Sequence, residues 1–81
     1  MVRYTARVRT PADVGLALQQ ARLARGLAQT EVADEIGIPQ STVSQMESGQ
    51  TTIYMRRLLE MARAIGMELS ATWEDEDAPG S

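Results

Sequence analysis

The sequence predicts a mainly α-helical domain of four to five helices with a short β-strand at each end. Apolar residues recur every three to four positions through the middle of the chain, glycine or proline separates these stretches, and apolar and polar residues alternate at both ends. With 81 residues the chain has the size of one domain. A domain this short builds only a small core, which favours association with a second subunit.

The N-terminal segment, residues 1–10, is predicted to be a strand, because apolar residues occupy every second position from Val2 to Val8. A disordered basic arm is the alternative. A second alternating segment, residues 67–73, predicts another strand. Residues 74–81 are acidic and then read Ala-Pro-Gly-Ser, which is typical of a disordered tail.

Between the strands, residues 11–66 predict four helices, over 11–25, 29–36, 40–48 and 53–65. Thr10 and Pro11 form a helix start, with Asp13 at the third helical position. Only three residues separate the second and third helices, so these two short helices are expected to cross at a steep angle. The apolar residues expected to face inward are Val14, Leu18, Ala21, Val32, Ala33, Ile36, Val43, Met46, Met55, Leu58, Leu59, Ala62 and Ile65.

The composition excludes several kinds of function. The chain has no cysteine, histidine or lysine, which removes disulfides, sulfur or imidazole metal sites, and the usual activated nucleophiles. We therefore expect no enzyme activity, no cofactor and no metal. No apolar run is long enough to span a membrane, so a cytoplasmic, nucleoid-associated protein without membrane contact is expected.

The net charge of −3 is unevenly distributed. Four of the 11 acidic residues lie in positions 74–77, which leaves seven against eight arginines in the rest of the chain. The body of the protein is therefore close to neutral, and the overall charge does not exclude binding to nucleic acid.

The predicted helix over 40–48 carries an uncharged polar stripe. Ser41, Ser44, Gln45 and Ser48 follow the i, i+3, i+4, i+7 spacing, and Gln40 stands at the leading end. Amide and hydroxyl groups are those that bind base edges, and glutamine can pair with N6 and N7 of adenine. A merely soluble face is the alternative, but the two short helices joined by a glycine-containing turn favour DNA recognition.

Residues 26–49, from Gly26-Leu27-Ala28-Gln29 to Met46-Glu47-Ser48-Gly49, resemble the Cro/phage-repressor (Xre-like) helix-turn-helix family. The likeness covers about residues 13–66 and implies a phage-repressor-like DNA-binding domain whose third helix enters the major groove. Ala28 departs from the family, which usually has a capping Thr or Ser there. By resemblance, the base-reading positions are Gln40, Ser41, Ser44 and Gln45, and Gln29 and Thr42 contact the DNA backbone.

Further site residues surround this helix. The resemblance implies that Arg22 and Glu47 form a structural ion pair inside the fold, with Arg22 facing DNA as the alternative. Arg25, near the exposed end of the first helix, is a candidate phosphate ligand. Gln50 and Thr51, in the loop after the recognition helix, are expected to reach the DNA backbone.

The two terminal strands indicate a homodimer, because each is too short to be stable alone and leaves an edge without a partner. Two copies of strand 67–73 are expected to form an intersubunit sheet across a two-fold axis, burying Leu69, Ala71 and Trp73. Such a dimer would present two recognition helices about 34 Å apart to a palindromic double-stranded DNA operator.

The order of elements, with Met67-Glu68-Leu69-Ser70-Ala71-Thr72-Trp73 at the end, also resembles the antitoxins of Hip-type toxin–antitoxin pairs. That family implies a dimeric autorepressor that binds a kinase-like toxin. The sequence thus predicts a DNA-binding transcriptional repressor, the antitoxin of such a pair. The alternatives are a stand-alone repressor without a toxin, and a protein-interaction module without DNA binding that uses its acidic tail.

Overall fold

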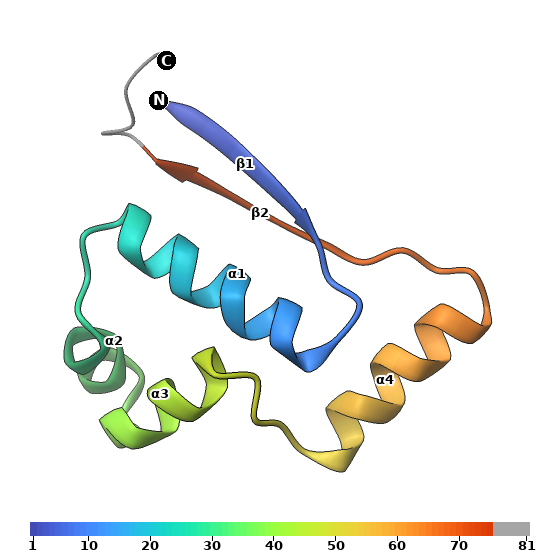
Figure 1. The fold of residues 1–81 in the computed structure, drawn as a ribbon. Helices are drawn as coiled ribbons and strands as arrows, with labels where there is room; N and C mark the ends of the chain where they lie inside the picture. Colours follow the sequence, from blue (N-terminus) through green and yellow to red (C-terminus); the bar gives the residue numbers. More distant parts are fainter. Residues whose placement is uncertain (76–81) are drawn as a thin grey trace.

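The computed structural model describes residues 1–75, which form four helices with a strand at each end (Figure 1). The fold is mainly helical, as predicted. No helix in this part of the chain is long and apolar enough to cross a membrane. The elements are β1 (Val2–Arg7), α1 (Pro11–Ala24), α2 (Gln29–Ile36), α3 (Gln40–Glu47), α4 (Ile53–Ala64) and β2 (Ser70–Asp75).

Helix α1 begins at Pro11, as the sequence predicted, and its first turn is capped reciprocally by Thr10 and Asp13. The hydroxyl of Thr10 accepts from the backbone N–H of Asp13 at 3.2 Å, and the Asp13 carboxylate accepts from the N–H groups of Arg9 and Thr10 at 2.9 and 3.1 Å. These backbone N–H groups, that of Arg9 above all, lower the pKa of Asp13 because they bind its charged form.

The turn between α2 and α3 is set by two residues with restricted backbones. Gly37 adopts φ +75°, a left-handed conformation that suits glycine, and its N–H and that of Ile38 both donate to the carbonyl of Ala33, at 2.9 and 3.0 Å. Pro39 then precedes the first residue of α3 with φ −62°. The three-residue turn therefore ends one helix and immediately starts the next.

The two strands pair with each other in an antiparallel ladder that runs from Val2 opposite Asp75 to Arg7 opposite Ser70. The N-terminal residues are therefore a strand and not a disordered arm. The rings of Tyr4 and Trp73 stack with centroids 5.9 Å apart. On the opposite face the strands carry polar side chains such as Thr5 and Thr72, whose hydroxyls lie 3.3 Å apart.

Strand β2 is displaced from the predicted range of 67–73. It starts at Ser70 because the chain first closes α4, with the N–H of Met67 donating to the carbonyl of Ala62 at 2.8 Å. It continues to Asp75 because the ladder with β1 extends to the pair of Val2 and Asp75. Positions 74 and 75, predicted to belong to the tail, are thus part of β2. The rest of the predicted tail, 76–81, lies outside the described residues.

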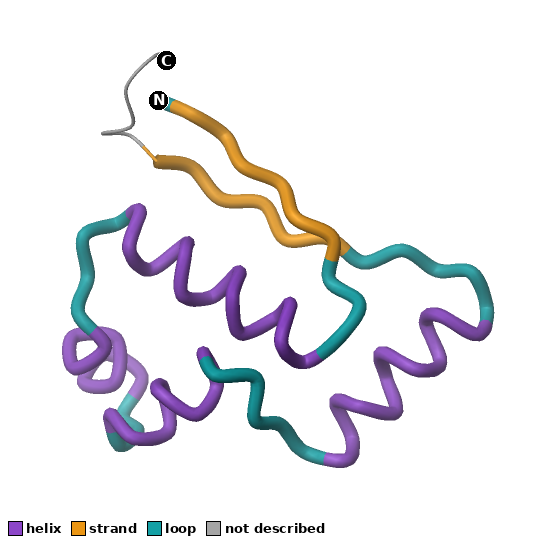
Figure 2. The backbone as a smooth tube through the Cα atoms, viewed as in Figure 1, coloured by secondary structure: helices purple, strands orange, loops and turns teal. Residues whose placement is uncertain are grey.

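Helix α1 is the middle layer, with the two-stranded sheet of β1 and β2 on one side and α3 on the other (Figure 1). The molecule measures 37 × 33 × 16 Å and is therefore flat. Two connecting loops, 48–52 and 65–69, carry the chain to and from α4 at one side of this stack (Figure 2). Within residues 1–75, the buried positions are Gly15, Ala17, Ala33, Val43, Leu59 and Ala62.

Several residues predicted to be inward are instead largely exposed. On α4, Leu59 and Ala62 are buried, whereas Leu58 and Ile65 are 38% and 64% exposed. The reason is that α4 contacts α1 only sparsely, so that one narrow face of α4 is covered and the adjacent apolar stripe is not. Leu18, Ile36 and Met46, also predicted to face inward, are exposed as well.

Candidate nucleic-acid interface

The outer face of α3 is polar, uncharged and accessible. Gln40, Ser41, Ser44 and Gln45 are all exposed, whereas Val43 on the opposite side is only 5% exposed. No acidic or basic residue lies in the first turn of α3, and none of these four side chains is charged. This face therefore offers amide and hydroxyl groups without an acid that would repel phosphate.

Ser48, the last member of the predicted stripe, lies just beyond the helix. Its hydroxyl donates to the carbonyl of Gln45 at 2.8 Å, and its N–H donates to the carbonyl of Ser44. The N–H of Gln50 also donates to the Gln45 carbonyl, at 3.0 Å. These bonds fix the end of α3 and the start of the following loop.

The other predicted backbone contacts are spread around this helix. Arg25 is exposed at the end of α1, and Gln50 is exposed in the loop after α3. Thr42 and Thr51 are half-buried. Among the predicted DNA-contacting residues, the structure joins the side chains of Gln29 and Gln40 directly by a hydrogen bond.

Arg22 and Glu47 form a bidentate ion pair that ties α1 to α3. The Nε atom of Arg22 lies 2.6 Å from Oε2 of Glu47, and its Nη2 atom lies 2.9 Å from Oε1. The side chains are only 11% and 6% exposed. The third nitrogen of Arg22, Nη1, donates to the carbonyl of Leu27 at 2.7 Å, which holds the loop before α2. The guanidinium is thus directed into the fold.

Both members of this pair are stabilised in their charged forms. Hydrogen bonds from Arg22, and then from Gln29, hold the pKa of Glu47 below its ordinary value despite the opposing effect of burial. Glu47 in turn raises the pKa of Arg22. The core of the helix-turn-helix unit therefore contains a carboxylate that is ionised at neutral pH.

A hydrogen-bond chain that the sequence did not reveal leads from this pair to the surface. The Nε2 atom of Gln29 donates to Oε1 of Glu47 at 3.1 Å, and Nε2 of Gln40 donates to Oε1 of Gln29 at 2.6 Å. Gln29 belongs to α2, whereas Gln40 and Glu47 stand at opposite ends of α3, and neither their spacing nor their pattern indicates that the three side chains meet. The chain connects the buried ion pair to the leading end of the candidate interface.

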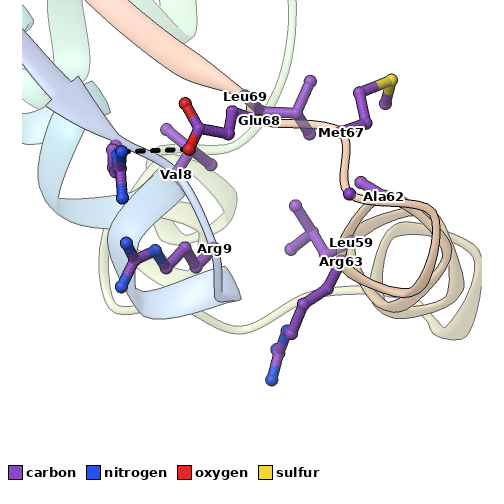
Figure 3. Close-up of a pocket in the computed structure, with 10 residues that line it drawn as sticks. Val8, Arg9, Leu59, Ala62, Arg63, Met67, Glu68 and Leu69 are labelled. Carbon is purple, nitrogen blue, oxygen red and sulfur yellow. Dashed lines mark ion pairs between the residues drawn. The ribbon is translucent and has the colours of Figure 1, made fainter.

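A cavity with a volume of about 400 Å³ lies elsewhere, between the end of β1, α4 and the link to β2 (Figure 3). Apolar side chains such as Val8, Leu59 and Leu69 line it, and the Arg7–Glu68 ion pair, 3.0 Å long, lies beside it. It contains no nucleophile next to a base. Within residues 1–75, no cluster of three acidic residues could hold a metal ion.

Comparison with known proteins identifies the fold unit that carries the polar face. A family model described as helix-turn-helix matches residues 18–71, two thirds of the chain. The chain belongs to the helix-turn-helix family. This confirms the broader of the two resemblances seen in the sequence. The helix-turn-helix match includes the whole of α2 and α3 and ends within β2.

One curated relative is an uncharacterised HTH-type transcriptional regulator, y4mF, of Sinorhizobium fredii. It is 27% identical over 63 residues, which cover 78% of this chain and 83% of the relative. No solved structure gives a significant match. Helix-turn-helix proteins of this family are DNA-binding regulators and typically not enzymes, so the chain is a DNA-binding regulator of the helix-turn-helix class.

Proposed function

We propose that the protein is a transcriptional repressor that reads a palindromic operator as a homodimer, with α3 in the major groove. The observation that carries the proposal is the exposed, uncharged face of α3. In helix-turn-helix proteins the N-terminal residues of the second helix contact base edges. Those residues here are Gln40, Ser41, Ser44 and Gln45, whose amides and hydroxyls match the donors and acceptors of the major groove.

Groups that bind phosphate would flank this face. Gln29 opens α2, where the helix dipole and the backbone N–H groups of the first turn attract an anion, while the carboxylate of Glu31 accepts from the N–H of Ala28 at 2.9 Å. The exposed guanidinium of Arg25 supplies a positive charge, and Gln50, Thr51 and Thr42 supply amide or hydroxyl donors. These contacts would fix the orientation of the domain on the duplex and carry no sequence information.

The dimer that we propose forms along the free edge of β2. Ala71 and Trp73 already line a cavity together with residues of α1 in the same chain, and Leu69 lies just before β2, so a second copy would engage β2 mainly through its backbone. The N–H of Val8 donates to the carbonyl of Leu69, which shows which residues of the second strand turn their backbone groups toward the first strand: every second one, counted from Leu69. By that alternation the backbone groups of positions 70, 72 and 74 point away from β1.

Replacing Thr72 with proline tests both the proposed dimer and its binding to a palindromic operator. Thr72→Pro removes an N–H from the free edge of β2 and leaves the backbone hydrogen bonds between β1 and β2 in place; the hydroxyl contact between Thr5 and Thr72 is lost in this variant and in its control alike. We expect the variant to sediment as a monomer. On DNA from upstream of its own reading frame, we expect the wild type to protect two half-sites about one helical turn apart and the variant to require much higher concentrations.

Thr5→Pro is the matched control, because Thr5 lies directly opposite Thr72 and its N–H faces the free edge of β1. It should remain dimeric. A third variant, Met61→Glu, places a charge on the exposed apolar stripe of α4, where Met61 is 65% exposed. If Thr72→Pro stays dimeric while Met61→Glu becomes monomeric, the dimer uses α4 and our strand assignment is wrong.

We further propose that the protein is an antitoxin that works in the cytoplasm at the nucleoid. Support comes from the likeness of its element order, a helix-turn-helix unit between two short strands, to Hip-type antitoxins. A kinase-like toxin would then be its second partner. Co-purification with the product of the neighbouring reading frame separates an antitoxin from a stand-alone repressor, since only the antitoxin is retained together with that product.

A further inference from the structure

The orientation of the Gln40 amide is fixed from inside the fold. An amide group can present either its oxygen or its NH₂ to a neighbour, and the two choices offer opposite hydrogen bonds to a base. Gln40 donates through Nε2 to Oε1 of Gln29 at 2.6 Å. The Oε1 atom of Gln40 and one of its N–H groups therefore remain for a ligand. Which groups of Gln40 remain depends on whether Gln29 turns its oxygen or its NH₂ toward Gln40.

Gln29 is in turn held by Glu47. An ionised carboxylate only accepts hydrogen bonds, and the Oε1 atom of Glu47 already accepts from Arg22. Gln29 must therefore turn its NH₂ toward Glu47, as observed at 3.1 Å. The reverse orientation would bring two acceptor oxygens together. With its NH₂ committed to Glu47, Gln29 can offer only its oxygen to Gln40.

We infer that Glu47 is a positioning residue that sets the base preference of Gln40 through Gln29. The relay, defined as Glu47, Gln29 and Gln40, leaves Gln40 with one acceptor and one donor, the pattern that matches N6 and N7 of adenine. If both amides turned over, Gln40 would present only donors, which match O6 and N7 of guanine. This inference rests on the proposed function and concerns its specificity.

Cutting the relay at Gln29 tests the inference without breaking the ion pair. Gln29→Met keeps the length of the side chain but neither donates to Glu47 nor accepts from Gln40. Binding is measured with duplexes that differ only at the base pair that Gln40 reads, which is identified as the position whose preference disappears in Gln40→Ala. The wild type should favour adenine over guanine there roughly tenfold or more, and Gln29→Met should reduce that ratio to within about threefold.

A second variant, Glu47→Gln, can both donate to and accept from Gln29, and should move the preference toward guanine in the same way. Glu47→Gln also weakens the ion pair with Arg22 and can therefore prevent folding. In that case the result with Gln29→Met alone tests the relay. The base pair read by Gln45 is the internal control, and its preference should not change. A merely structural role of Gln29 would weaken binding to all duplexes equally.

The outcomes separate this inference from the proposed function. If Gln29→Met keeps the adenine preference of the wild type, the relay does not set specificity, although α3 still reads DNA. If the wild type prefers no duplex over any other, the proposed function and the inference fail together.

Discussion

Replacing Gly15 with alanine is expected to destabilise the protein by about 1–3 kcal/mol or more, although alanine normally favours a helix by about 1 kcal/mol over glycine. Gly15 is buried where α1 crosses the end of α3. A Cβ atom at this position would lie 2.5 Å from the carbonyl oxygen of Glu47 and 2.7 Å from that of Met46. Both are backbone atoms, so relief requires the two helices to separate.

Urea unfolding followed by circular dichroism measures this effect. Leu16→Ala is the control, since the next residue of α1 is 56% exposed and its truncation should change the free energy of unfolding by about 0.5 kcal/mol or less. A Gly15→Ala protein as stable as the wild type would show that the helices do not approach as closely as described.

Glu47→Ala is expected to lower the free energy of unfolding by about 3–5 kcal/mol, because it leaves the guanidinium of Arg22 without its partner in a nearly buried position. It also removes the acceptor for Gln29. The Arg57–Glu60 pair, with a 3.0 Å contact and side chains that are 69% and 56% exposed, offers the comparison. Arg57→Ala should cost about 1 kcal/mol or less.

The Arg22–Glu47 pair also makes stability depend on pH. Because the folded protein lowers the pKa of Glu47, its contribution is complete above the ordinary glutamate pKa and is lost as the pH falls through the lower folded-state value. Unfolding measured between pH 7 and pH 3 should show this loss in the wild type and less of it in Glu47→Ala. If the free energy of unfolding fell equally in the two proteins between pH 7 and pH 3, the lowered pKa of Glu47 would be contradicted.

Helix positions were predictable from the sequence because local chemistry sets them. Thr10 and Asp13 cap α1 through atoms only three residues apart, and Gly37 and Pro39 fix the turn before α3. The polar stripe was equally visible, since helical periodicity alone decides which side chains share a face. For the same reason the family resemblance could be drawn from residues 26–49.

Contacts between distant segments were not predictable in the same way. That Gly15 is needed where α1 meets α3, and that Gln29 links Glu47 to Gln40, depends on how the helices cross. The exposure of Leu58 was missed because periodicity identifies an apolar face but not whether another element covers it. The boundaries of β2 were displaced because pairing with β1, and not the alternation in β2 alone, decides where the strand starts and ends.

Selection of duplexes from a random pool shows whether the outer face of α3 reads DNA sequence, as we claim. The wild type, the Gln40→Ala/Gln45→Ala double variant and Arg25→Ala are compared. Arg25→Ala should bind all duplexes more weakly, with a salt dependence lower by about one unit of slope, yet select the wild-type motif. The double variant should lose about 1–3 kcal/mol per glutamine and select a relaxed motif. A double variant that selects the unchanged wild-type motif would contradict the claim.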